Sequence, residues 1–240
     1  MHFMCKLSGL ALSFWCATCL AQAPAQLTAT AASDSWIYLE PAQIDSTRFL
    51  GPPPDAAATR REIAGMLLLQ EQRTPEQASQ IAADHEQSVF RFAGVMGNAF
   101  RRDRLPLTNR LFETLHETGN AIEKQGKKKW RRVRPPLFDA RIRPVARYSA
   151  SGSYPSGHAT FSFLSAIVLA DMVPEKSEQI FTRAREFGEN RVLGGVHYPS
   201  DIAAGQRLAT LIAVLIQQNP AFQQDYAAAR TELRAALELQ

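Results

Sequence analysis

The stretch GSYPSGHATFSFLSAIVLADM, residues 152–172, decides how this chain folds and suggests what it binds. Its second half is apolar on most sides when drawn as a helix, which is typical of a helix at the centre of a core. Gly152, Ser153 and Pro155 form a turn before that helix, so free backbone N–H groups collect at its N-terminus, where anions bind readily. His158 falls in the first helical turn. A lone Ser-Gly-His is more often a plain capping turn, so this stretch needs partners elsewhere.

Helical patterns fill most of the chain on both sides of this stretch. Residues 74–100 are predicted as one helix, with Thr74 as N-cap and Gln77 at the capping-box position. The chain shows neither a strand-like alternation of useful length nor an internal repeat. The sequence therefore predicts an all-α fold, a compact helical bundle. Further helices are predicted near residues 107–122, 159–173, 174–191, 202–216 and 220–239.

The first residues form a different kind of segment. Lys6 precedes an apolar run over residues 7–20, and small residues follow it, which is the pattern of a secretory signal peptide. We expect residues 1–21 to be removed, with cleavage possible after residue 23, and the mature protein to be periplasmic or secreted. A membrane anchor is the alternative, but the run is shorter than the roughly 20 apolar residues that span a bilayer.

The domain organisation follows from the same segment. Cys5, Cys16 and Cys19 all lie in it, so the mature chain has no thiol for a disulfide or a Cys-based metal site. Residues 22–55 are Ala/Thr/Ser-rich and end in LGPPPD, which excludes regular helix there because proline has no amide donor. We expect an extended N-terminal arm over residues 22–55 and a single helical domain over residues 56–240, with no membrane span after signal cleavage.

The run KKKWRRVRPP, residues 127–136, carries six cations in ten residues. Such runs usually bind nucleic acid or another polyanion, or form a solvated face. The whole chain has 27 basic and 23 acidic residues, and so mild an excess does not indicate a general polyanion binder. A third interpretation, part of a site for one small anion, stays open.

A second cluster of chemically active residues lies in NRVLGGVHYPSD, residues 190–201. His197 precedes Asp201 by four residues, so the carboxylate can accept a hydrogen bond from Nδ1–H of the imidazole. That contact leaves Nε2 unprotonated and nucleophilic. Taken alone the spacing is weak, because a surface histidine and a helix-capping aspartate often produce it.

Three motifs stand in order along the chain. They have the forms K-x6-RP, PSGH and R-x5-H-x3-D, and they begin at Lys127, Pro155 and Arg191. Together they resemble the signature of the type 2 phosphatidic acid phosphatase superfamily, and specifically the secreted class A bacterial non-specific acid phosphatases. The likeness covers roughly residues 45–238. It departs from the family at Asn190, where serine is usual.

The resemblance implies metal-free phosphoryl transfer through a phosphohistidine, without a cofactor. His197 would attack phosphorus, Asp201 would orient it, and His158 would protonate the leaving alcohol and then activate water. Cations and oriented amides suit this chemistry, because charge gathers on the equatorial oxygens in the transition state. Asn190 would support the site through an altered contact. The groups implied to hold the phosphate oxygens are Lys127, Arg134, Arg191, Ser156 and the Gly157 amide.

The predicted function is therefore a broad-specificity acid phosphatase that acts on small phosphate monoesters and does not bind nucleic acid as a polymer. Three alternatives remain: a phosphatase of lipid phosphates or diphosphates, a vanadium-dependent haloperoxidase with the same anion cradle, and a non-catalytic phosphate- or nucleic-acid-binding protein. The resemblance and the apolar helix surface are compatible with a homo-oligomer, such as a dimer.

The other polar residues of note are predicted to have structural or surface roles. His85 and His116 fall in predicted helices, far along the chain from the motifs. The remaining cations of the basic run should be mainly solvated, because a segment that turns Lys127 and Arg134 inward must turn neighbours outward. These cations are Lys128, Lys129, Arg131 and Arg132.

Overall fold

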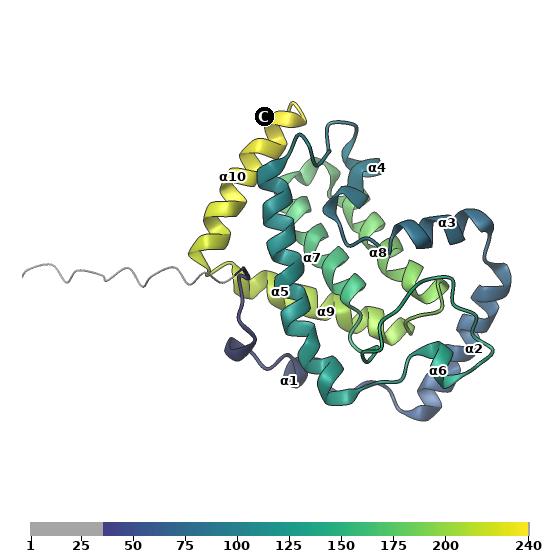
Figure 1. Cartoon of the computed structure of the whole chain (residues 1–240). Helices are drawn as coiled ribbons and strands as arrows, with labels where there is room; N and C mark the ends of the chain where they lie inside the picture. The colour runs from purple at the N-terminus through teal and green to yellow at the C-terminus, as the bar shows by residue number, and fades with distance from the viewer. Residues whose placement is uncertain (1–35, 240) are drawn as a thin grey trace, which may run out of the picture. The chain divides into compact units, whose positions relative to one another are not determined.

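The computed structural model describes residues 36–239, which form helices and loops without a strand (Figure 1). The all-α prediction is confirmed for this part of the chain. The predicted signal peptide, its cleavage site and the start of the predicted arm lie outside the described residues. The α-helices are α1 (Ser46–Leu50), α2 (Ala56–Gln72), α3 (Pro75–Ala83), α4 (Ala93–Met96), α5 (Pro106–Trp130), α6 (Pro135–Phe138), α7 (Gly157–Met172), α8 (Ser177–Leu193), α9 (Pro199–Ile216) and α10 (Pro220–Ala236). Three short 3-10 helices are η1 (Pro41–Gln43), η2 (Val89–Phe92) and η3 (Pro174–Lys176).

Helix α7 is the centre of the core, as its sequence predicts. It contacts α8, α9 and α5 along its length, and Figure 1 shows it between α5 and α8. Its buried side chains include Phe161, Leu164 and Leu169. Because α7 is covered on several sides, its N-terminal turn is held firmly among the surrounding helices.

The N-termini of α7 and α9 approach each other closely. Gly205 of α9 makes this possible, because a Cβ atom there would lie 2.6 Å from the carbonyl oxygen of Ser156 and 2.9 Å from Ala159 Cβ. The backbone N–H of Ser156 donates to the carbonyl oxygen of Asp201 at 3.0 Å. This contact joins the PSGH turn directly to the first turn of α9.

Helix α5 forms one side of the bundle, and α10 lies along it (Figure 1). Helix α5 is followed by Arg131 as its C-cap. The backbone of Arg131 is left-handed with φ 44°, and its N–H donates to the carbonyl oxygen of Lys127. The chain then turns through the two prolines that begin α6. This reversal places residues 127–134 beside the N-termini of α7 and α9.

Residues 36–55 are not extended throughout, in contrast to the predicted arm. They include η1 and α1, and Asp45 caps α1 by accepting a hydrogen bond from the Thr47 N–H. Tyr38 is buried, and its N–H donates to Thr118 Oγ1 of α5. Side-chain capping and contacts with α5 thus give local helix to a stretch whose composition predicts none.

The predicted single helix over residues 74–100 is wrong. Its start is confirmed, since Thr74 caps α3 in a capping box with Gln77, but α3 ends at Ala83 and the chain resumes as η2 and α4. Asp84 accounts for the break, because its buried carboxylate accepts hydrogen bonds from Arg91 and from Arg183 of α8. Tertiary contacts here override the local helical pattern.

No helix within residues 36–239 combines the length and the apolar character that a bilayer crossing requires.

Candidate active site

The nucleophile predicted from the sequence, His197, is buried beside Asp201. Its Nδ1 lies 3.1 Å from Asp201 Oδ2, and its Nε2 lies 3.1 Å from Arg134 Nη1. An arginine N–H can only donate, so Nε2 accepts and the ring proton sits on Nδ1, where it is donated to Asp201. This is the tautomer in which Nε2 carries no proton and its electron pair faces Arg134.

The electrostatic surroundings keep His197 neutral. Burial, together with the charges of Arg134 and Lys127, lowers the pKa of His197 well below its usual range. Burial raises the pKa of Asp201 to about 6, while the guanidinium of Arg132 opposes that shift. A neutral imidazole facing cations is the form that can attack an electrophilic phosphorus.

Arg191 provides an unusual pair of unused donors. Its side chain is almost fully buried, and only Nη2 has an acceptor, the carbonyl oxygen of Arg147 at 2.9 Å. Nε and Nη1 are buried without a hydrogen-bond partner among the described residues. Burial and the neighbouring Arg134 lower the pKa of Arg191 to about 10, so it stays charged at neutral pH. Buried donors without partners are costly, which indicates that an anion completes them.

Arg134 and Lys127 occupy neighbouring positions. Arg134 is held by the carbonyl oxygens of Ser151 and Val196, each at 3.1 Å. Lys127 Nζ binds Glu123 Oε1 one turn earlier on α5, at 2.6 Å. The three cations predicted to clamp a phosphate therefore come from α5, the following turn and the end of α8.

Glu123 is a carboxylate inside this group of cations. It is buried, and its Oε2 has no hydrogen-bond partner in the described part of the chain. Burial raises its pKa, although Lys127 and Arg134 oppose the shift. Gly157 lies directly against it, since a Cβ atom at that position would come within 2.3 Å of Glu123 Oε2. The glycine of PSGH is therefore needed for close approach of the backbone to this site.

The PSGH turn has the geometry of a helix N-terminal anion site. Ser156 is the N-cap of α7 and accepts a hydrogen bond from the N–H of Ala159 at 3.4 Å. His158 follows in the first turn. Its Nε2 lies 3.2 Å from the carbonyl oxygen of His85, so Nε2 carries a proton and donates it. Burial and the nearby Arg191 hold the pKa of His158 well below its usual range.

Comparisons with known proteins agree with this arrangement. A family model described as the PAP2 superfamily matches residues 116–224. The chain is 32% identical over 201 residues to the non-specific acid phosphatase of Salmonella typhi, covering 79% of this chain and 80% of that protein. It is 29% identical over 214 residues to the non-specific acid phosphatase of Providencia stuartii, covering 81% and 84%.

The chain belongs to the PAP2 superfamily. As a PAP2 protein similar to the bacterial non-specific acid phosphatases, it is a phosphoric monoester hydrolase, and the predicted enzyme class is confirmed. A solved transmembrane PAP2 type phosphatidylglycerolphosphate phosphatase from Bacillus subtilis has 20% identity and a TM-score of 0.49, with 71% of this chain and 88% of that chain covered.

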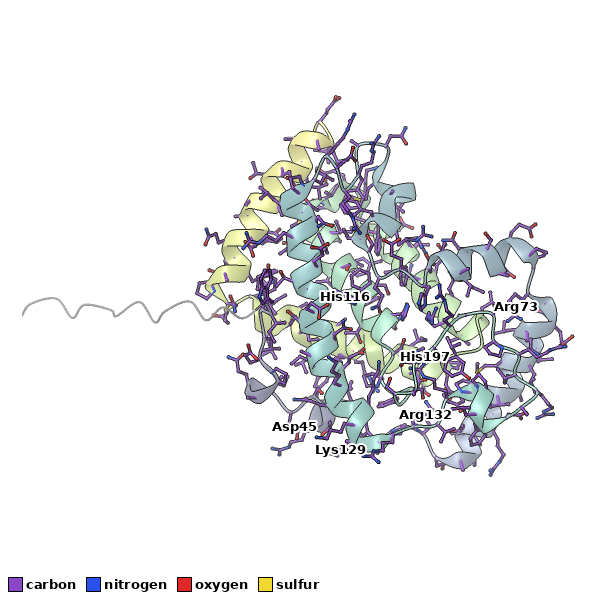
Figure 2. The ribbon with its side chains drawn as sticks, viewed as in Figure 1. Asp45, Arg73, His116, Lys129, Arg132 and His197 are labelled. Atoms are coloured by element: carbon purple, nitrogen blue, oxygen red, sulfur yellow. The ribbon has the colours of Figure 1, made fainter. Side chains whose placement is uncertain are left out.

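The prediction that Arg132 is solvated is wrong for this PAP2 protein. Arg132 Nη1 donates to Asp201 Oδ1 and Nη2 to Glu62 Oε2, at 2.7 and 2.8 Å, and the guanidinium lies 3.9 Å from the ring centroid of Tyr198. Figure 2 shows Arg132 beyond the lower end of α5 and His197 above it. The spacing of Arg132 and Arg134 is a signal for this, because residues two apart in extended chain before a proline point to the same side.

His85 is exposed, in keeping with the predicted structural or surface role, but it lies beside the site although it is far from the motifs along the chain. Besides its carbonyl contact, its ring centroid lies 5.9 Å from that of His158. Asn190, the departure from the usual family residue, donates from Nδ2 to Asp84 Oδ2 at 2.7 Å and so connects α8 to the residue before His85. No sequence spacing reveals this contact, because it joins α3 and α8 across about a hundred residues. His116, in contrast, packs against Phe161 with ring centroids 5.2 Å apart.

An open cavity of about 740 Å³ adjoins the cations of the PAP2 site. Lys127 and Arg134 reach it from one side, and Ser149, Ser151 and Gly152 line it from the loop before α7. Within residues 36–239 no cluster of three or more His, Cys, Asp or Glu side chains has a metal-binding arrangement. The groups around the cavity are chiefly cationic, which suits an anionic substrate.

Proposed function

We propose that this protein is a broad-specificity acid phosphatase that hydrolyses phosphate monoesters through a covalent phosphohistidine. The observation that carries the proposal is the buried Arg191, whose Nε and Nη1 have no partner among the described residues, near a His197 that keeps Nε2 free of a proton. Unused buried donors beside a neutral nucleophile suit the binding and attack of a phosphate group.

In the first step the phosphate dianion binds to Lys127, Arg134 and Arg191, with Ser156 and the Gly157 amide contributing hydrogen bonds. His197 Nε2 then forms a bond to phosphorus while the bond from phosphorus to the leaving oxygen breaks. Asp201 stabilises the resulting positive charge on the imidazole by accepting its Nδ1–H.

His158 handles the protons. The arriving phosphate dianion offsets the charge of Arg191 and raises the pKa of His158, so this ring takes up a proton and can give it to the leaving alcohol. The neutral His158 then removes a proton from water as the water oxygen bonds to phosphorus. The bond from His197 Nε2 to phosphorus breaks, and inorganic phosphate leaves.

Metal independence is part of the proposal because side-chain cations occupy the positions around the phosphate. Their positive charge supplies the stabilisation that divalent metals give in other phosphatases, and it opposes binding of another cation beside them. The periplasmic or secreted location rests on the predicted signal peptide, and the homodimer stays a prediction.

The test uses the mature protein, a generic aryl phosphate and a chelator. Phosphate release should persist with the chelator present, and rapid quench in alkaline denaturant should trap a phosphohistidine that is stable in base and labile in acid. His197→Ala should abolish turnover, while His116→Ala, which changes a histidine outside the cradle, should retain most of it. Complete loss of activity on chelation would contradict metal independence, and substantial turnover by His197→Ala would remove His197 as nucleophile.

A substrate panel tests the alternatives. Lipid phosphates and diphosphates should be hydrolysed more slowly than water-soluble monoesters, and added vanadate should inhibit without producing halide oxidation. Faster hydrolysis of the lipid substrates would contradict a preference for water-soluble monoesters and indicate a lipid phosphatase. Halide oxidation with vanadate would indicate a haloperoxidase.

A further inference from the structure

One face of α5 carries more cations than Lys127, the single residue of that helix that the proposed function assigns to the phosphate. Lys124 and Lys128 are spaced as i and i+4, so they share a helix face with Lys127, and Arg131 directly follows the helix. All four side chains line the open cavity of about 740 Å³. Lys129 is on another face, where its Nζ donates to Thr47 Oγ1 at 2.8 Å, and Figure 2 shows it near Asp45.

The outer cations of this face have one carboxylate near them, Glu123, whose charge interacts with Lys124 without forming an ion pair. The side chains of Lys124, Lys128 and Arg131 make no hydrogen bond and no ion pair with the residues that the structure describes. Glu123 is the single carboxylate among the described residues lining the cavity, and its Oε1 is bound by Lys127. The outer part of the cavity is therefore a concave cationic surface.

Helix stability does not account for this arrangement. Like charges one turn apart destabilise a helix by about 0.2–0.5 kcal/mol per pair, and Lys124 has such neighbours in Lys127 and Lys128. Cations in a last turn gain from the helix dipole, which covers Lys128, but Lys124 precedes that turn. Arg131 adopts the left-handed backbone that glycine or asparagine favours, with φ 44°. A bound anion offsets these costs.

The cavity has room for more than the phosphate that is cleaved. Its inner end is formed by Lys127 and Arg134, which the proposed function assigns to that phosphate. The helix rises about 1.5 Å per residue, so Lys124 and Arg131 lie roughly 5 Å along the axis on either side of Lys127. A second anionic group on a short leaving group would therefore meet these cations while the first phosphate is held.

We propose that Lys124, Lys128 and Arg131 form a subsite for a second phosphate group carried by the leaving group, so that small bisphosphorylated molecules are the preferred substrates. The inference rests on the proposed phosphatase function, since it places the scissile phosphate at Lys127 and Arg134. Arg131 contributes a planar fork suited to two phosphate oxygens, and the two lysines contribute point charges.

The test compares two substrates that differ by one phosphate, fructose 1,6-bisphosphate and fructose 6-phosphate, at moderate ionic strength. The wild type should have the higher kcat/KM for the bisphosphate. The variant Lys124→Gln/Lys128→Gln/Arg131→Gln should reduce the ratio of the two kcat/KM values by about tenfold or more, mainly through KM of the bisphosphate, as expected for loss of several charged contacts.

A matched control removes the same number of charges elsewhere. Arg60→Gln/Arg61→Gln/Lys129→Gln changes exposed cations that do not line the cavity, and it should leave the ratio unchanged. An equal fall of the ratio in both triple variants would show general attraction of anions and overturn the subsite. An unchanged ratio in the cavity variant would overturn it too.

Thermal unfolding shows whether the triple cavity variant folds, and a single variant tests the subsite if it does not. If the triple cavity variant does not fold, Lys124→Gln alone, at an exposed position of α5, should still lower the ratio by a few-fold, and an unchanged ratio there would overturn the subsite. Absence of hydrolysis of any monoester by the folded wild type would instead contradict the proposed function itself.

Discussion

Arg132 and Arg191 are two buried arginines of the same site, and their surroundings differ in one respect. Arg132 donates to Asp201, Glu62, Ser200 and Thr59, so its hydrogen-bonding capacity is largely used within the protein. Within residues 36–239, Arg191 has a single acceptor, a backbone carbonyl, and two of its buried nitrogen atoms have no partner. A buried cation with partners holds the fold together, whereas one without them is available to a ligand.

The largest expected effect is on catalysis by Arg191→Met. It removes a preorganised donor from the proposed phosphate site, so kcat/KM for an aryl phosphate should fall by about 10²–10³-fold or more. The free energy of unfolding should change by less than about 1 kcal/mol, because few protein hydrogen bonds are lost. Steady-state kinetics and urea unfolding measure the two quantities. Strong destabilisation with nearly normal kinetics in the folded fraction would show that Arg191 stabilises the fold and does not bind the phosphate.

The variant Arg132→Met should lose much more stability than Arg191→Met. It leaves Asp201 and Glu62 buried without their partner, and breaking a buried ion pair in this way costs about 3–5 kcal/mol of stability. Urea unfolding followed by circular dichroism measures the loss. The control Arg143→Gln removes an exposed pair with Glu71 and should cost less than about 1 kcal/mol. Equal losses in the two variants would contradict a structural role for the Arg132 cluster.

Glu123→Gln tests a buried carboxylate whose second oxygen is unpartnered. Because burial raises the folded-state pKa of Glu123, its ionisation costs stability, so the wild type should lose both stability and phosphate affinity as pH rises through that pKa. The glutamine variant should bind inorganic phosphate about tenfold more tightly at neutral pH, with less difference in acid, since it removes a like charge near the ligand. Competitive inhibition by phosphate across pH measures this. Weaker binding at neutral pH would instead give Glu123 the role of positioning Lys127.

The smallest effect is expected for Asn190→Ser, which restores the usual family residue. Asp84 keeps its arginine partners, so the loss of one amide donor should cost about 1 kcal/mol of stability and change kcat/KM less than threefold. Thermal unfolding and kinetics of the same preparation check both. A large kinetic loss would show that the Asp84 contact sets the position of His85 and His158.

The sequence was sufficient for those parts of the molecule that depend on local patterns. The central helix α7 follows from its apolar run, and the start of α3 from the capping box at Thr74 and Gln77. The three motifs were sufficient to identify the family. His197 precedes Asp201 by four residues, so their contact was predictable, although the spacing alone was weak and the other two motifs were needed to single it out.

The remainder depends on contacts between distant segments. Arg132 looked like one solvated cation in a basic run because Glu62 and Asp201 are about 70 residues away on either side of it. His85 lies beside His158 only because the chain breaks at Asp84, and that break is held by Arg183 and Asn190 of α8. Composition and periodicity contain no information about such pairings.

Asp201 joins two parts of the site, because its carboxylate accepts hydrogen bonds from His197 and Arg132 while its backbone carbonyl accepts one from the N–H of Ser156. One residue thereby sets the distance from the His197 ring to the amides of the PSGH turn, independently of the chain that connects the two motifs. The connection between α7 and α8, residues 173–176, takes no part in this link, so a change of its length leaves the contact of α7 and α9 at Gly205 in place. The relative position of the two helix starts is therefore set by contacts and not by the connecting chain, and a mutational scan should find insertions better tolerated in the α7 to α8 connection than in either helix start.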